Sequence, residues 1–186
     1  VYSAHPCVSA GSFTTNRVKA APVKVTQAHL RARELRAIVA NSGNANACTG
    51  VPGIQDARAM AKSVATTLGL RQREIGVCST GVIGLPLPMD RITPGLESLS
   101  GCLSTRGGSE VAKAIMTSDT SVKEIAVTTT IGGRKIHIGA CAKGAGMICP
   151  SMATMLCFVT TDANLSKACL QKSLLEAVEA GGSPGW

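Results

Sequence analysis

Aromatic side chains are scarce in this chain of 186 residues, which has one Trp, one Tyr and two Phe. Proteins that bind single-stranded nucleic acids stack bases on aromatic rings, and duplex binders gather Lys and Arg on one element. The chain has neither pattern, although Lys and Arg outnumber Asp and Glu by 19 to 11. We therefore expect no nucleic-acid binding. We interpret the basic residues as a solvated surface, and recognition of an anionic small molecule or an acidic partner is the alternative.

Metal-ligand spacing and long apolar runs are also missing. The eight cysteines form no C-x-x-C pair, and His5, His29 and His137 are far apart in the sequence, so we expect no zinc site. No apolar run approaches the ~20 residues of a membrane span, and no cleavable signal peptide begins the chain. The sequence predicts a soluble intracellular protein with reduced cysteines, in the cytoplasm or, in a eukaryote, in the mitochondrial matrix or plastid stroma.

The composition is that of a folded domain, with 45% hydrophobic and 16% charged residues. We expect a single α/β domain over residues 1–180 and a loose tail over residues 181–186, because no linker precedes the Gly-rich end. The chain begins without Met, inside what reads as a strand over residues 1–8. We therefore expect the natural protein to extend beyond this sequence.

Segments with strand and helix patterns alternate along the chain, which indicates an α/β or α+β class. The predicted strands cover residues 37–40, 75–79, 124–130, 135–140 and 155–160, with a hairpin turn at Gly132-Gly133. The predicted helices begin after a Pro52-Gly53 turn, at Pro88 with a break or kink at Pro94-Gly95, at a Ser109 cap, and at about residue 166.

Two glycine-bearing loops could carry chemistry. Thr80-Gly81 follows a strand and offers a hydroxyl and a backbone N–H in one place, as an oxyanion site requires, although an ordinary turn has the same pattern. The segment around Gly144 and Gly146 lacks the third glycine of a dinucleotide site and the G-K-[ST] of a phosphate loop. We interpret it as a tight turn.

Four motifs, in this order, resemble those of the ornithine acetyltransferase family. They are NSGNANACTG at 41–50, STGVIG at 79–84, AIMTSDT at 114–120 and KGAGMICPSMATML at 143–156. The resemblance extends over nearly the whole chain, but family proteins are about twice as long. It implies an α/β fold with sheets packed between helices. It also implies that the chain corresponds to the family's α chain plus the start of the β chain, within an α2β2 heterotetramer.

The resemblance also implies a set of site residues. Thr154 would be the nucleophile, freed by self-cleavage of the Ala153-Thr154 bond, with Thr80 and Gly81 as oxyanion donors. A threonine hydroxyl is a weak nucleophile, but cleavage exposes an α-amine of pKa about 7.7–8.0 that can serve as its general base. Thr117 and Lys143 would contact the substrate. A helix C-cap and a surface lysine are the alternatives for these two residues.

The implied activity is that of a glutamate N-acetyltransferase in arginine biosynthesis. An acetyl group would pass from N-acetylornithine to glutamate through acetyl-threonine, without a metal or organic cofactor, and acetyl-CoA is an open second donor. One alternative is an N-terminal-nucleophile amidase or aminopeptidase, in which water accepts the acyl group. The other is a truncated, non-catalytic fragment, because an acidic residue, a C-terminal asparagine and a nearby threonine of the family have no counterpart here.

Overall fold

The computed structural model of the protein describes residues 1–32, 34–144 and 155–181. Helices and strands are interspersed along this part of the chain, as the sequence predicts. In chain order they are α1 (Ala21–Ala32), β1 (Ala37–Asn44), α2 (Gly50–Leu68), the 3-10 turn η1 (Gln72–Glu74), β2 (Ile75–Val82), α3 (Met89–Ser100), α4 (Gly108–Ala114), β3 (Lys123–Ile131), β4 (Arg134–Lys143), β5 (Leu156–Thr161) and α5 (Lys167–Gly181). No helix within the described ranges is long and apolar enough to cross a membrane.

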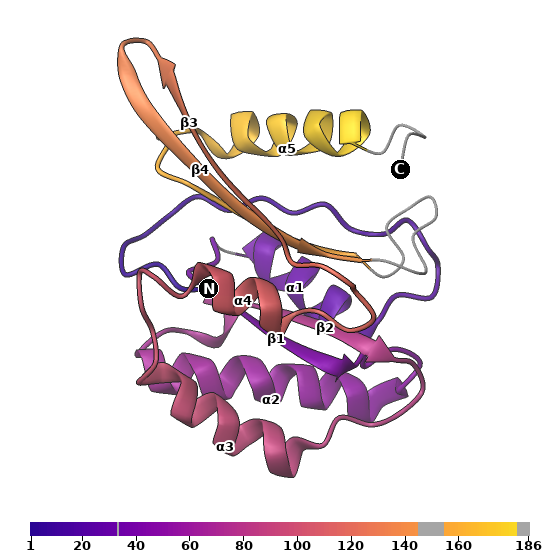
Figure 1. Cartoon of the computed structure of the whole chain (residues 1–186). Helices are drawn as coiled ribbons and strands as arrows, with labels where there is room; N and C mark the ends of the chain where they lie inside the picture. The colour runs from indigo at the N-terminus through magenta and orange to yellow at the C-terminus, as the bar shows by residue number, and fades with distance from the viewer. Residues whose placement is uncertain (33, 145–154, 182–186) are drawn as a thin grey trace.

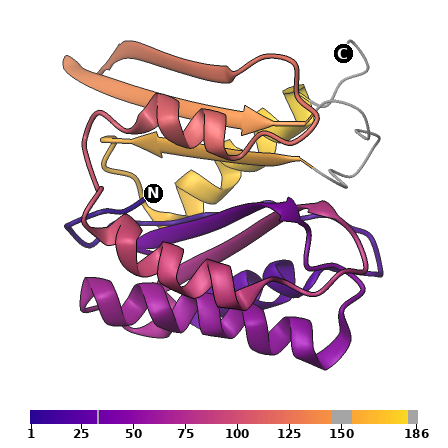
Figure 2. The same cartoon turned by 60° about the horizontal axis from the view of Figure 1, so that its bottom comes forward.

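The strands form two sheets that lie one above the other (Figures 1 and 2). One sheet is the parallel pair β1–β2, and the other is the antiparallel sheet β3–β4–β5. In both views α2 and α3 lie on the side of the parallel sheet that faces away from the antiparallel sheet. Helix α1 packs against β2 and α2, and α4 packs against β4 and β3. The two sheets therefore meet on the side that α2 leaves uncovered.

The parallel pair is a β1–α2–β2 unit. Parallel strands need a long crossover connection, and α2 supplies it. The residues that α2 buries recur at helical spacing and are small or unbranched, namely Gly53, Ala57, Met60, Ala61 and Ala65. Strand register runs from Ala37 opposite Ile75 to Asn44 opposite Val82, so both strands end at the same edge of the sheet.

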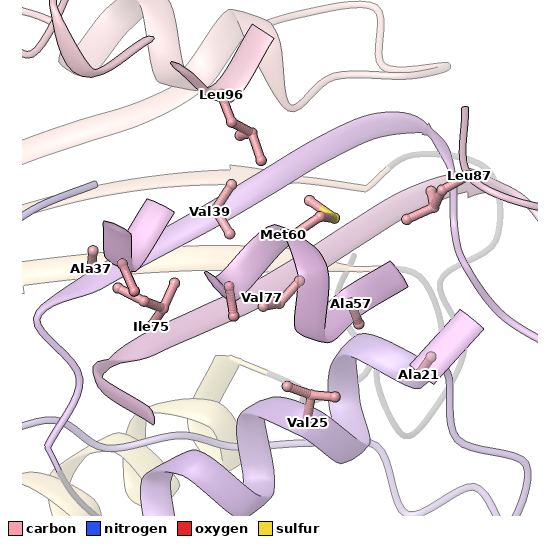
Figure 3. Packing of buried hydrophobic residues seen from close by; sticks show 12 residues of the cluster. Ala21, Val25, Ala37, Val39, Ala57, Met60, Ile75, Val77, Leu87 and Leu96 are labelled. Carbon is pink, nitrogen blue, oxygen red and sulfur yellow. The ribbon is translucent and has the colours of Figure 1, made fainter. Parts of the chain in front are cut away.

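Aliphatic residues and one methionine build the core, as the shortage of aromatics requires. Figure 3 shows Met60 of α2 beside Val39 of β1 and Val77 of β2, with Val25 of α1 on one side and Leu96 of α3 on another. Met60, Ile75 and Val77 are at most 1% exposed. This core holds the parallel strands against the helices and thereby fixes where the strand ends lie.

The predicted turn at Pro52-Gly53 and the predicted break at Pro94-Gly95 were wrong, because both positions lie within helices. Helix α2 begins at Gly50, so Pro52 lies in its first turn, where a missing N–H costs no helical hydrogen bond. Gly53 allows close contact with the preceding loop, because a Cβ there would lie 1.9 Å from Thr49 Oγ1. Helix α3 continues through Pro94, whose neighbourhood is exposed, so water can bond the carbonyl that loses its N–H partner.

Other departures concern the N-terminal third and the start of α4. Helix α1 was not predicted. Residues 1–8 form no regular strand, and they contribute an isolated bridge between Tyr2 and Ala37 at the edge of β1. Ser109 is not the cap of α4, since the helix begins after Gly107 and the Ser109 hydroxyl donates to Glu124 Oε1 at 3.0 Å.

The core predicts a large stability loss on truncation of Met60. We expect Met60→Ala to lower the free energy of unfolding by about 2–5 kcal/mol, because the apolar contacts are lost and a cavity remains. Urea unfolding followed by circular dichroism measures this change. Val51→Ala in the same helix is the control, since Val51 is 71% exposed. Equal stability of the two variants would show that Met60 does not anchor the core.

Candidate active site

The carboxyl ends of β1 and β2 carry a run of small and polar residues. The register places Ser42 opposite Thr80 and Gly43 opposite Gly81. Side chains tie the strand ends together, because the Ser79 hydroxyl donates to Asn41 Oδ1 at 2.6 Å and Asn41 Nδ2 donates to the Asn44 carbonyl at 2.9 Å. The first two sequence motifs therefore meet at one edge of the parallel sheet.

The backbone at Gly81 has a conformation that requires glycine. Its φ is +128°, and a Cβ would lie 2.2 Å from the carbonyl carbon and oxygen of Gly43. Backbone, unlike the end of a flexible side chain, cannot move aside cheaply. The close approach of Gly43 and Gly81 thus fixes the backbone next to Thr80, which is itself 5% exposed.

The rest of the first motif supports the start of α2. Asn46 is fully buried, and its Nδ2 donates to the Gly53 carbonyl at 2.8 Å. Thr49 Oγ1 donates to Asn46 Oδ1 at 2.6 Å. These contacts hold the loop after β1 against the first turn of α2. Asn46 and Thr49 therefore have a structural role beside the strand ends.

Lys143, the last residue of β4, reaches the end of β2. Its Nζ donates to Thr80 Oγ1 at 2.9 Å and to Thr117 Oγ1 at 2.8 Å, and the residue is 5% exposed. Lys143 is therefore not a surface lysine. Thr117 lies beyond the end of α4 at Ala114, so it is not the C-cap of that helix. Three predicted site residues, from three separate segments, meet at one ammonium group.

The Lys143 ammonium has neutral partners. Among the described residues no carboxylate forms an ion pair with it. A buried charge without an opposite charge is costly, and an anionic group placed beside it would relieve that cost. The arrangement can therefore stabilise a negative charge that binds or develops next to Thr80.

Asp119 was missed as a site residue although it lies within the third motif. Its carboxylate is fully enclosed and accepts hydrogen bonds from Lys123 Nζ at 2.7 Å, from the Gly144 N–H at 2.7 Å and from the Thr117 N–H at 3.4 Å. Burial alone raises the pKa of the Asp119 carboxyl, but the bonds from Lys123, Gly144 and Thr117 outweigh it and lower the pKa to about 2. Asp119 is therefore ionised throughout the physiological pH range.

Two of the predicted residues, Ala153 and Thr154, lie outside the described residues, as does Gly146. The described chain resumes just before β5, in which Leu156 pairs with Lys143 of β4. No group of three or more His, Cys, Asp or Glu side chains that could hold a metal ion occurs in residues 1–32, 34–144 and 155–181.

Comparison with known proteins gives consistent matches. A sequence profile described as "ArgJ family" matches residues 1–181. The "Arginine biosynthesis bifunctional protein ArgJ" of Symbiobacterium thermophilum is 55% identical over 174 residues, which are 94% of this chain and 43% of that protein. "ArgJ 1" of Clostridium acetobutylicum is 49% identical over 96% of this chain and 44% of its own length. The chain thus spans less than half the length of these curated relatives.

Two solved structures are also similar. The crystal structure of an arginine biosynthesis bifunctional protein from Bacillus halodurans has a TM-score of 0.74 and 39% identity, covering 83% of this chain and 80% of that one. Ornithine acetyltransferase from Mycobacterium tuberculosis, solved with ornithine, has a TM-score of 0.68 and 40% identity, covering 81% and 80%. These likenesses confirm the predicted α/β fold with sheets packed between helices.

The close approach at Gly81 predicts that an alanine there is not tolerated. We expect Gly81→Ala to displace the end of β2 from Gly43 and to separate Thr80 from the Lys143 ammonium. The free energy of unfolding should fall by about 1–3 kcal/mol, and the melting temperature should therefore fall by several degrees. Gly84→Ala, which also has a positive φ but open space around its Cβ, is the matched control. Equal melting temperatures would contradict a steric role for Gly81.

Proposed function

Because the chain belongs to the ArgJ family, we propose that it carries the catalytic threonine and oxyanion site of a glutamate N-acetyltransferase in arginine biosynthesis. An acetyl group passes from N-acetylornithine to Thr154, and then from Thr154 to glutamate. Membership of this family confirms the resemblance to the ornithine acetyltransferase family on which the sequence-based prediction depended.

One observation carries the proposal. The Lys143 ammonium is buried against the hydroxyls of Thr80 and Thr117, at 2.9 and 2.8 Å. Acetyl transfer creates a negatively charged oxygen in its tetrahedral intermediate, and fixed donors beside that oxygen lower the barrier. A buried cation that already bonds the Thr80 hydroxyl supports the role of Thr80 as such a donor. The backbone N–H of Gly81 is the proposed second donor.

The proposed cycle has two halves. Thr154 Oγ attacks the acetyl carbonyl carbon of N-acetylornithine, with the α-amine of Thr154 taking the hydroxyl proton. The C–N bond then breaks, the proton passes to the departing ornithine amine, and an acetyl ester remains on Thr154. The glutamate amine attacks this ester, N-acetylglutamate leaves and the Thr154 hydroxyl is restored. Thr117 and Lys143 contact the amino-acid substrates, and the cycle uses no metal or organic cofactor.

Self-cleavage before Thr154 is part of the proposal, since it supplies the α-amine. The shares of its relatives' lengths that this chain spans support self-cleavage. This chain spans 80% of the Bacillus halodurans chain but 43–44% of whole curated relatives, so the chain in that crystal is much shorter than those proteins. That difference fits a family whose members exist as two polypeptides. We propose an α chain ending at Ala153 and a β chain beginning at Thr154, assembled as α2β2.

An exposed apolar surface supports a polypeptide partner for this chain. Ile125, Val127 and Ile131 of β3 are 62%, 44% and 65% exposed, and Val159 of β5 is 54% exposed. The register places Ile125, Val127 and Val159 on one face of the antiparallel sheet. Exposed apolar patches of this kind mark interaction sites. The rest of the β chain is the proposed partner.

Loss of the Thr80 hydroxyl tests the oxyanion role. In the complete gene product, we expect Thr80→Ala to lower kcat on the order of 10²-fold while changing KM much less, as for loss of one oxyanion donor. The assay measures N-acetylglutamate formed from N-acetylornithine and glutamate. Thr66→Ala on the exposed side of α2 is the control and should keep full activity. An unchanged kcat in Thr80→Ala would remove Thr80 from the mechanism.

The same assay separates the proposal from an amidase or aminopeptidase. If water were the acceptor, free acetate would form at a rate independent of glutamate. We expect instead that product formation depends on glutamate and yields N-acetylglutamate in equal amount to ornithine.

Intact mass tests the proposed cleavage. The complete gene product should yield two polypeptides that separate between Ala153 and Thr154, and Thr154→Ala should yield one uncut chain without activity. Thr129→Ala, an exposed threonine on β3, is the control and should still be cut. An uncut wild-type protein that turns over substrate would exclude self-cleavage as a requirement.

A further inference from the structure

The Asp119 carboxylate lies in the loop between α4 and β3 and is fully enclosed. One of its donors, Lys123, has a side chain that is 43% exposed, as in an ordinary surface ion pair. The other two donors are backbone N–H groups of Thr117 and Gly144. An enclosed carboxylate that bonds backbone donors from two segments fixes the spacing of those segments.

These two segments carry the side chains that meet at the ammonium group. Thr117 provides both an N–H to Asp119 and the hydroxyl that accepts from Lys143 Nζ at 2.8 Å. Gly144 follows Lys143 directly, and its N–H reaches Asp119 Oδ1 at 2.7 Å. The contacts therefore form a closed ring from Asp119 through Thr117 and Lys143 to Gly144 and back. Among the described residues the donors to Asp119 are Thr117, Lys123 and Gly144 and not Lys143 Nζ, so the influence of Asp119 on Lys143 passes through the backbone.

The ring determines which way the Thr80 hydroxyl can donate. A hydroxyl has one O–H donor and two lone pairs. Because Lys143 Nζ donates to Thr80 Oγ1, one lone pair is used and the O–H must point away from the ammonium group. The O–H is then available to a further acceptor. The adjacent positive charge strengthens it as a donor.

We propose that Asp119 is a positioning residue of the oxyanion site: its carboxylate holds the Thr117 and Gly144 backbones so that the Lys143 ammonium stays against Thr80 and leaves the Thr80 O–H to the oxyanion. This inference rests on the proposed function of Thr80. Without the carboxylate, the end of β4 shifts relative to Thr117, and the Thr80 hydroxyl can turn its proton toward other acceptors.

A double-mutant cycle between Asp119 and Thr80 tests the proposal in the complete gene product. The substitution Asp119→Asn keeps the size of the side chain but removes its charge and replaces one carboxylate oxygen with an N–H₂ group, so one of the two backbone donors loses its acceptor. We expect kcat to fall about tenfold and KM for N-acetylornithine to change less than about threefold. In the Thr80→Ala background the same substitution should lower kcat less than about twofold, because the group through which it acts is gone.

A structural effect on the fold would act equally in both backgrounds. An equal loss of kcat in the two backgrounds, or an unchanged kcat in Asp119→Asn alone, would therefore overturn the proposal. If Asp119→Asn does not fold, Asp119→Glu replaces it in the same cycle, since it retains the charge and moves the oxygens by one methylene. The same non-additivity is expected. A wild-type protein that transfers no acetyl group would instead refute the proposed function.

Lys123→Met separates the surface ion pair from the backbone contacts. It removes one donor to Asp119 and leaves those of Thr117 and Gly144 in place. We expect kcat to remain within about twofold of the wild-type value. A loss as large as that of Asp119→Asn would mean that the ion pair, and not the ring, carries the effect, and would overturn the proposal. Asp162→Asn, at an exposed carboxylate, is the control for the replacement of an aspartate by an asparagine.

Discussion

The structure of the site depends on one buried ammonium group. Moving an ammonium ion out of water costs several kcal/mol even after the protein relaxes. The two hydrogen bonds from Lys143 to Thr80 and Thr117 return about 1.5–3 kcal/mol each, as bonds that involve a charged group do. When the desolvation cost is set against these hydrogen bonds, a negative charge beside the ammonium group is still favoured. That condition exists only when the end of β4 meets the end of β2, so the site forms together with the packing of the two sheets.

The parallel sheet fixes the position of the end of β2, which is one of the two strand ends that meet at the site. The aliphatic core around Met60 holds β1 and β2 against α2, and the register brings Gly43 beside Gly81. Because a side chain at Gly81 would collide with the Gly43 backbone, the strand end has little freedom. Thr80 is thus presented from a rigid element, which a preorganised donor requires. Strand β4 of the antiparallel sheet places the Lys143 ammonium group beside Thr80. Asp119 limits how far the end of β4 can shift.

Local patterns predicted much of the fold, and the misses have local causes. Apolar runs indicated β1 and β2, and Gly132-Gly133 between alternating segments indicated the hairpin β3–β4. Helix α1 was missed because it begins with Ala21-Pro22 and mixes polar with apolar residues along its length. Pro94 does not break α3, because a single lost hydrogen bond on an exposed face is tolerated when the opposite face, at Leu96, is buried.

Local sequence patterns predicted the site less well than they predicted the fold. Thr80-Gly81 stood out as a predicted turn after a strand over residues 75–79, whereas the structure places both residues within β2 (Ile75–Val82). Lys143 did not stand out in this way, because it is 63 residues from Thr80 and 26 from Thr117 in the sequence. No periodicity links residues at such separations, and a family resemblance was needed to group them. Asp119 was missed as a site residue even with the family resemblance. Its decisive partners are backbone N–H groups, one of them 25 residues away, and every residue type except proline offers such a donor.

Strand β4 connects the site to the exposed apolar surface. Alternate residues of a strand face opposite sides, so Cys141 and Lys143 face the parallel sheet while Ile138 and Ala140 face the other way. On the inner side Phe158, opposite Cys141, is buried, and on the outer side Ile125 and Val159, opposite Ala140, are exposed. A polypeptide that covers the outer face would hold the same strand whose last residue supplies the ammonium group. Covering that face would therefore stabilise the position of Lys143 as well as remove apolar surface from water. In this arrangement the proposed assembly with a partner polypeptide and the preorganisation of the proposed oxyanion site are one physical process, because both depend on where β4 ends.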